Sequence, residues 1–214
     1  PAMGTGTLQV TATPYPGNIV VADLATIPLT GSNVTLTINS FARSGRPDDL
    51  DMLLVAPTAG ANLIVWSDVG GTGGATGTLT ITLSDSGATF LPDVGPLASG
   101  TFKPTNEIPL GVTENPFPAP APAGPYGNPG PAGAGTSTFA SEFNGTNPNG
   151  TWSPYVLDDT PNSGGETTTI GSWSLDINAT VIPPSTLATW LNAPASADWN
   201  TGTNWSGGIA AVNP

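Results

Sequence analysis

The chain has 214 residues, 28 of them glycine and 24 proline, and it contains no cysteine and no histidine. Three basic residues stand against fifteen acidic ones, so the formal net charge at pH 7 is −12. Too few cations remain for binding to nucleic-acid phosphates or to anionic lipid, and the missing histidine and cysteine exclude Ser-His-Asp triads, Cys-His pairs and His-based zinc sites.

The N-terminal third predicts short strands separated by turns. Residues 1–4 (Pro-Ala-Met-Gly) are typical of a protease site left after cloning, and we interpret them as a scar on a fragment of a longer protein. Weak alternation over 5–13, a short apolar run at 18–22 and clear alternation over 34–39 predict the first three strands. Turns rich in proline and glycine separate them.

The next stretch predicts a β-hairpin. Residues 50–55 form a largely apolar run, as expected of a strand that is covered on both faces. Residues 57–60 are a turn cluster, and residues 63–66 are the returning strand. If the turn is centred near Ala59, antiparallel pairing sets Leu50 roughly opposite Asp68.

The hairpin is expected to bring four carboxylates together at its open end, namely Asp48, Asp49, Asp51 and Asp68. Carboxylates this close repel each other unless positive charge lies between them. Arg43 and Arg46 are the only basic residues nearby. Either the acidic side chains fan into solvent, or Ca²⁺, which takes six to eight oxygen ligands, binds between them. We favour calcium.

The remainder of the chain predicts further strands around a long irregular segment. Residues 78–83, 100–104, 151–157 and 173–181 read as strands, with the missing N–H of Pro154 turned away from a partner strand. The segment 108–135, rich in proline, alanine and glycine, is either a free linker or an ordered loop over a sandwich. We favour the loop because domain-like sequence resumes after it. About eight or nine strands without helical periodicity predict an all-β sandwich.

Aromatic and paired acidic residues have simpler interpretations than catalysis. Trp66, Trp152 and Trp173 lie on predicted strands, where core packing is the first interpretation and a sugar-binding platform the alternative. Asp158 and Asp159 could in principle cleave glycosides, but neighbours on a strand point to opposite faces, so we expect a solvated loop end. We therefore expect that this chain is not an enzyme.

Several motifs follow one another in order and at suitable spacing: residues 47–51 with 54–57, residues 66–71, residues 118–122, residues 143–153 and residues 171–175. Together they resemble the bacterial branch of the proprotein convertase P-domain family. The similarity covers roughly residues 8–181. It implies a jelly-roll β-sandwich, which we assign to residues 5–182. Pro154 departs from the aliphatic residue that is usual in the family.

The resemblance also implies a set of metal ligands. It places Asp49, Asp51 and Asp68 at the calcium-prone end of the sheet. It adds Asp85, because the family often has acidic residues after that strand. Residues 183–214, which hold Trp190, Trp199 and Trp205, are interpreted as a linker and the start of a Trp/Asn-rich repeat unit. That tail resembles the repeats that open autotransporter-type passengers.

These expectations combine into one function and two alternatives. We expect a non-catalytic, calcium-stabilised module of a secreted or cell-surface bacterial protein with a structural or adhesive role. Its partners are a calcium ion and either other domains of the same chain or a protein or glycan surface, with no nucleic acid and no membrane insertion. The alternatives are an accessory P domain that stabilises a subtilisin-like serine protease, as in the convertases, and a carbohydrate-binding module.

Overall fold

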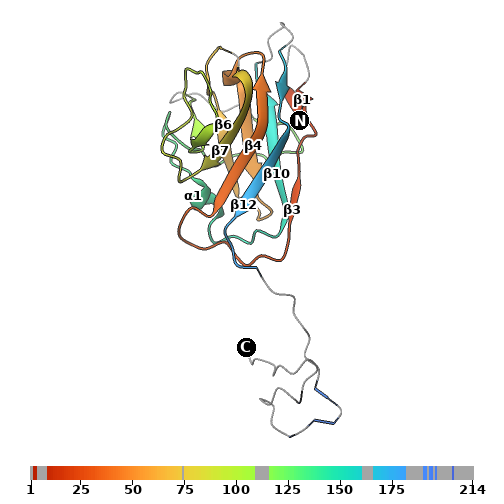
Figure 1. Cartoon of the computed structure of the whole chain (residues 1–214). Helices are drawn as coiled ribbons and strands as arrows, with labels where there is room; N and C mark the ends of the chain where they lie inside the picture. Colours follow the sequence, from red (N-terminus) through yellow and green to blue (C-terminus); the bar gives the residue numbers. More distant parts are fainter. Residues whose placement is uncertain are drawn as a thin grey trace. The chain divides into compact units, whose positions relative to one another are not determined.

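The computed structural model describes residues 2–3, 9–73, 75–108, 116–160 and 166–181, and the isolated positions 190, 191, 193, 194, 196 and 204. Contacts divide the chain into two units, residues 1–181 and residues 182–214. In its described residues the first unit consists of strands arranged as two facing sheets, one short α-helix, one 3₁₀ turn and long loops (Figure 1). The predicted all-β sandwich is confirmed, and its jelly-roll connectivity stays a prediction.

One sheet is built around β4 (Val34–Arg43). Its other strands are β7 (Ala75–Ser84), β8 (Gly100–Phe102), β12 (Ser172–Ile177), β11 (Thr168–Thr169) and β1 (Ala2–Met3). β7 pairs with one edge of β4, and β12 and β11 pair with the other. β8 runs parallel to β7, so this sheet is mixed.

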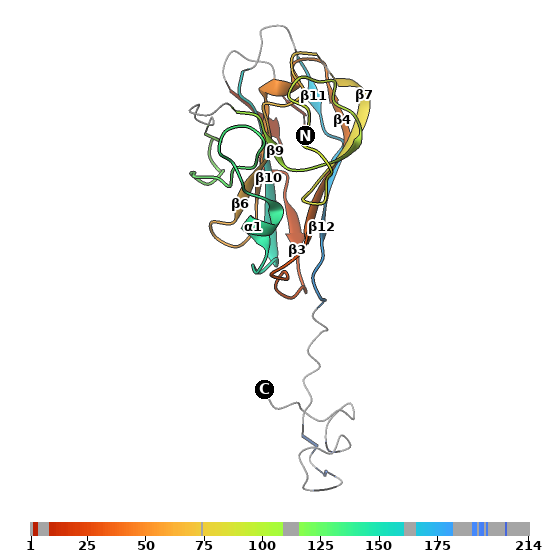
Figure 2. The same cartoon turned by 90° about the vertical axis from the view of Figure 1, so that its left-hand side faces the viewer.

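The second sheet is built around β10 (Gly150–Asp158). Its other strands are β2 (Val10–Thr13), β3 (Ile19–Val21), β5 (Leu50–Val55), β6 (Asn62–Ser67) and β9 (Thr105–Asn106). β5 pairs with one edge of β10, and β2 and β3 pair with the other. Figure 2 shows the two layers edge-on, with β4, β7, β11 and β12 on one side and β6, β9 and β10 on the other.

The main core lies between the two sheets. β4 and β12 alternate apolar and polar residues, whereas β5 and β6 are buried on both faces, and each sheet presents an apolar face to the other. Phe41 and Trp66 meet with ring centroids 5.1 Å apart, and Phe143 and Trp152 meet at the same distance. Trp66 and Trp152 are fully buried, which confirms the core interpretation for both, whereas Trp173 is partly buried against the core.

The central hairpin has the predicted register at its open end. Met52 pairs with Trp66. This is the same register that the prediction used when it set Leu50 opposite Asp68. A bulge follows, so Leu53 pairs with Ile64. The bulge adds one residue to β6, and the predicted register is therefore one residue off nearer the turn.

A second bulge explains why β4 is longer than predicted. The alternation of the sequence breaks after Ile38, and the ladder with β7 shifts register between Ile38 and Phe41. Ser40 takes a positive φ of 54° there. The bulge restores the inward direction at Phe41 and Arg43, both buried, so the strand continues to Arg43.

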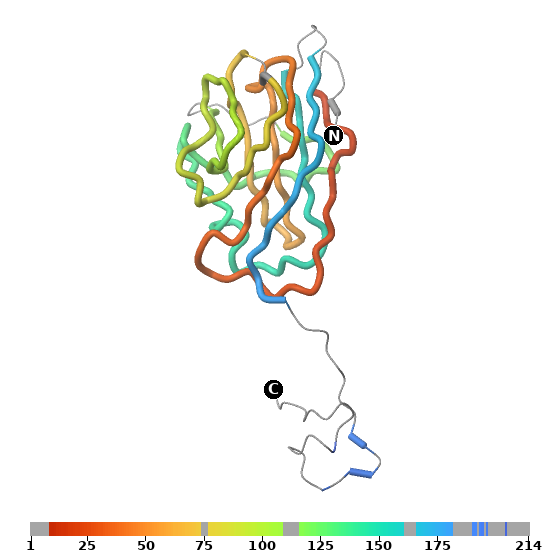
Figure 3. Tube along the Cα trace, in the orientation of Figure 1, coloured from red at the N-terminus to blue at the C-terminus, as the bar shows by residue number. Residues whose placement is uncertain are grey.

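The proline-rich segment covers the outer face of the second sheet. Phe117 is 4% exposed and packs with Leu53, Ile64, Tyr155 and Leu157 in a second apolar cluster. The tyrosine hydroxyls of Tyr15 and Tyr155 donate to carbonyls of Pro118 and Pro120. Figure 3 shows this segment, in green, running across the strands. The predicted ordered loop is confirmed for residues 116–135, and residues 109–115 lie outside the described part.

Pro154 occupies a place in β10 where no donor is needed. Its carbonyl accepts a hydrogen bond from the amide of Gly17, 3.1 Å away. Gly17 lies on the edge of β10 that also pairs with β2 and β3, which is the edge away from β5. In an antiparallel strand the N–H and C=O of one residue point to the same side. The missing N–H therefore points away from β5, as predicted.

A short helix was not predicted from the sequence. α1 (Phe139–Phe143) begins with a capping box in which Thr138 and Ser141 bond reciprocally. Phe139 and Phe143, one helical turn apart, are both fully buried. In the described part of the chain, no helix is long and apolar enough to cross a membrane.

The second unit is described at only a few positions. The carbonyl of Asn204 accepts from the amide of Leu191, and its side chain bonds twice with Ser196, at 3.0 Å in each direction. These bonds tie two parts of the tail together locally. Most of the predicted Trp/Asn-rich repeat lies outside the described residues.

Candidate functional site at the acidic end of the sandwich

The acidic end is assembled from four separate segments of the first unit. A single turn of 3₁₀ helix, η1 (Pro47–Asp49), precedes β5. The amide of Asp48 in this turn donates to the carbonyl of Gly71. The amide of Gly70 donates to Pro92, and the amide of Glu107 donates to Ser67. These bonds bring η1, the loop after β6 and the segments around 92 and 107 together.

Glycine is required in this assembly at position 70. Gly70 has a φ of +89°, and a Cβ there would lie 2.8 Å from side-chain atoms of Leu97 and Pro47. Asp68 also takes a positive φ, 54°, which aspartate tolerates better than most residues. The glycines of the 66–71 motif thus allow η1 and the 91–97 loop to approach the end of β6.

Arg43 binds most of the carboxylates on the inner side of this end. Its Nη1 donates to Asp158 Oδ2 at 2.8 Å and to Thr168 Oγ1 at 2.7 Å. Nη2 donates to Glu166 Oε2 at 3.1 Å and lies 3.9 Å from Asp49 Oδ2. The side chain of Arg43 is 0% exposed, so this is a buried ion-pair network between the two sheets.

Two predicted acidic residues therefore already have cationic partners. Arg46 bonds to Asp48 at 3.3 Å and lies 3.5 Å from Asp49. Burial nevertheless raises the pKa of Asp49 to about 6, since desolvation and the neighbouring Asp48 and Asp158 outweigh the two arginines. The expectation that Asp158 is solvated is wrong: it is 3% exposed, because it pairs with Arg43.

A second group of carboxylates has fewer cationic partners to offset its negative charge. Burial raises the pKa of Asp68, and Asp48 and Asp93 raise it further, although the hydroxyl of Ser67 donates to it at 2.7 Å. Burial likewise raises the pKa of Glu107, with Asp93 and Asp68 adding to the effect. We call Asp48, Asp68, Asp93 and Glu107 the carboxylate group. In the described residues, only its member Asp48 has an ion pair.

Asp51 lies in β5, on the face of the second sheet that Leu53 presents to the outer apolar cluster. β5 directs Leu50 and Met52 into the main core, whereas Leu53 belongs to the outer cluster. Asp51 and Leu53 are two residues apart in the strand, so their side chains point to the same face. Asp51 is 2% exposed and pairs across the ladder with Leu157, a member of the outer cluster. Asp51 therefore faces the outer apolar cluster, whereas Asp49, in η1, lies beside Arg43 and Arg46.

Asp85 lies at the opposite end of the sandwich. It follows Ser84, which pairs with Thr35 at the start of β4, whereas Arg43 is at the end of β4. The two ends are roughly 25 Å apart at ~3.3 Å per residue. Asp85 accepts from the amides of Phe139 and Ala140 at 2.9 and 2.7 Å. It therefore caps α1.

The four predicted ligands do not form one site in the structure. Carboxylate oxygens suit Ca²⁺ chemically, but in the described part of the chain no three acidic side chains are close enough to hold one metal ion. Of the predicted set, only Asp68 belongs to the carboxylate group. Asp93 and Glu107 were missed because both lie far from the hairpin in sequence. Arg43 was noticed only as a nearby charge.

Comparisons with known proteins returned nothing that this chain matches. No family model matches the chain, no curated protein matches it, and no solved structure matches it. The class that the fold defines is an all-β sandwich with a buried arginine ion pair at its acidic end.

Proposed function

We propose that this chain is a non-catalytic, calcium-stabilised β-sandwich module of a secreted or cell-surface protein, with a structural or adhesive role. The observation that carries the proposal is the carboxylate group, where burial and mutual repulsion raise the pKa of Asp68 and Glu107. A hard divalent cation is the partner that such oxygens favour. Calcium would supply the positive charge that these residues lack.

The location of the carboxylate group suits a stabilising role. Its members come from η1, from the end of β6 and from the segments at 93 and 107, which backbone hydrogen bonds already bring together. A cation held by Asp68 and Glu107 would link these segments at the end of the sandwich. Because it would bind the folded chain only, it would stabilise the fold by mass action.

Thermal unfolding with calcium and with a chelator tests the proposal. At about 100-fold over Kd we expect a gain of about 2.7 kcal/mol, or roughly 5–10 °C for a domain of this size. Asp68→Asn and Glu107→Gln should each lose most of this gain. Asp85→Asn is the matched control: it should lower the unfolding temperature in chelator and keep the calcium gain.

The same melts separate the predicted ligands. Asp51→Asn and Asp49→Asn remove the predicted ligands that lie outside the carboxylate group. Loss of the calcium gain in either variant, with Asp68→Asn unchanged, would move the site to those residues. No gain in the wild-type chain, with no calcium found by elemental analysis, would rule out calcium stabilisation.

The accessory role beside a subtilisin-like protease is a second candidate, and the sequence motifs favour it. The motifs 47–51 and 66–71, on which the resemblance rests, are the segments that build the acidic end. The coding sequence on either side of this chain decides between the two roles. A catalytic domain directly upstream supports the accessory role, and continuing Trp/Asn repeats downstream support the surface-protein role.

A further inference from the structure

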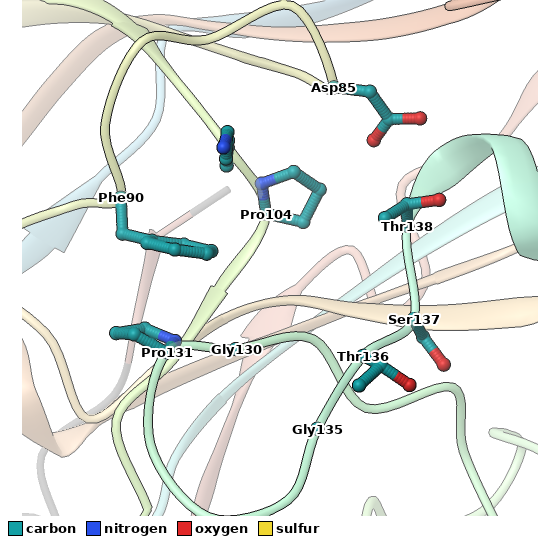
Figure 4. Close-up of a pocket in the computed structure, with 10 residues that line it drawn as sticks. Asp85, Phe90, Pro104, Gly130, Pro131, Gly135, Thr136, Ser137 and Thr138 are labelled. Carbon is teal, nitrogen blue, oxygen red and sulfur yellow. The ribbon is translucent and has the colours of Figure 1, made fainter.

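A preformed pocket lies at the other end of the sandwich, beside α1. Its volume is about 440 Å³, within the usual range for small-molecule sites. Figure 4 shows Phe90 and Pro131 along one side, Thr136 and Thr138 along the other, and Asp85 at the end nearest the helix. Lys103 also lines the pocket.

Lys103 is the unusual residue of this pocket. The chain has three basic residues, and the other two, Arg43 and Arg46, form ion pairs at the acidic end. Lys103 forms no ion pair with any carboxylate in the described part of the chain. Its Nζ lies 5.3 Å from the centroid of the Phe90 ring. In a chain of net charge −12, an ammonium group that contacts only an aromatic ring face, and no carboxylate, therefore lines a pocket.

Backbone hydrogen bonds hold the pocket walls in place. On one side, the amide of Lys103 donates to Thr89 at 2.8 Å, and Phe90 and Lys103 form a parallel bridge. On the other side, Asn106 donates to Gly130 at 2.9 Å. Asp85 accepts hydrogen bonds from the first two amides of α1, which fixes the helix against the loop that carries Asp85. A ligand would thus pay little ordering cost on binding.

The two charged residues of the pocket differ in what they offer. The charge of Asp85 is partly satisfied by the two amides of α1, but a carboxylate has about four acceptor positions, so it can still accept from hydroxyl groups. Lys103 offers donors only. A fitting ligand therefore carries a carboxylate for Lys103 and hydroxyl groups for Asp85 and Thr136.

We propose that this pocket binds an acidic sugar, with the carboxylate of a uronic acid unit on Lys103 and its ring hydroxyls on Asp85 and Thr136. Phe90 and Pro131 give the ring an apolar wall. The distant negative charges of the acidic end are screened, because the Debye length is about 8 Å at physiological ionic strength. The site is separate from the carboxylate group, so it goes beyond the calcium role and is tested without calcium.

Isothermal titration calorimetry of the full chain with trigalacturonate tests the proposal, with maltotriose as the neutral control. We expect saturable binding of trigalacturonate and none of maltotriose. Lys103→Gln should weaken binding by about tenfold or more, the usual effect of losing a charged hydrogen bond. Lys103→Arg should keep most of the affinity. Arg46→Gln, which removes the same charge at the acidic end, should bind like the wild-type chain.

The location is tested by amide chemical-shift mapping and by a blocking variant. Thr136 is exposed, so Thr136→Phe should keep the unfolding temperature while filling the pocket and abolishing binding. Shifts should concentrate at Phe90, Lys103 and Gly130. No saturable trigalacturonate binding, equal binding by Lys103→Gln, or equal binding of succinate and of free amino acids would overturn the assignment. A chain that shows no stabilisation by calcium but binds trigalacturonate would contradict the calcium proposal and support the sugar pocket.

Discussion

Arg43 Nη1 lies 2.8 Å from Asp158 Oδ2, and this ion pair joins β4 of one sheet to β10 of the other. Both side chains are almost completely buried. Thr168, Glu166 and the carbonyl of Arg46 accept the other bonds of the guanidinium. This buried ion pair therefore crosses from one sheet to the other at the acidic end, next to the apolar core that lies between the sheets.

Replacing this arginine should strongly destabilise the fold. Arg43→Gln leaves Asp158 buried without its cation, and breaking a buried pair in this way costs about 3–5 kcal/mol. Urea unfolding measures the loss. Arg46→Gln is the matched control, because its side chain is 42% exposed and its ion pairs should contribute less than about 1 kcal/mol. Equal losses in the two variants would contradict a special role for Arg43.

Stability without calcium should fall as the pH rises from about 4 to 6. The pKa of Asp49 is raised from 3.8 to about 6, so the folded chain binds this proton more tightly than the unfolded chain does. Stability from this group is present at low pH and is lost as the carboxyl ionises. Asp49→Asn should therefore gain about 2 kcal/mol relative to the wild-type chain between pH 4 and pH 7.

Chemical unfolding in chelator at several pH values measures this difference. Asp176→Asn, an exposed site on β12, controls for the change in net charge. A constant offset between Asp49→Asn and the wild-type chain at all pH values would show that Asp49 has no such coupling.

The cap on α1 should be worth a measurable amount. Asp85→Ala removes the acceptor of two helix amides, and losing a helix cap costs about 1–2 kcal/mol. Asp85→Asn should recover part of this, because an amide oxygen still accepts. Differential scanning calorimetry distinguishes the three chains. If Asp85→Ala melts like the wild-type chain, the two amide bonds contribute nothing to stability.

Phe117 should anchor the proline-rich loop. Its side chain is 4% exposed against Tyr155 and Leu53, so Phe117→Ala should cost about 3 kcal/mol. The loosened loop should also be cleaved faster by chymotrypsin after Tyr126. Leu29→Ala is the control, since Leu29 is 82% exposed and should change stability by less than about 0.5 kcal/mol. Unchanged cleavage in Phe117→Ala would mean that other contacts hold the loop.

Local patterns in the sequence predicted the longer strands of this protein, but not β1, β9 and β11. An apolar run and a turn cluster predicted the hairpin and its register at Met52 and Trp66, and the large apolar rings of Trp66 and Trp152 predicted that both lie in the core. Apolar runs, turn clusters and side-chain periodicity can all be read from a single stretch of sequence. The same periodicity misses a bulge, so the prediction ended β4 at Asn39 and left Arg43 outside it.

Only the tertiary structure decided which charges meet. Asp49 lies 3.9 Å from Arg43 and 3.5 Å from Arg46, and Asp68, far from Glu107 in the sequence, lies close enough to raise the pKa of Glu107. Asp158 is buried because a strand of the other sheet brings Arg43 to it. Desolvation and charge pairing depend on distances between segments far apart in the chain. For that reason the sequence determined the sandwich, and the fold determined the electrostatics of its acidic end.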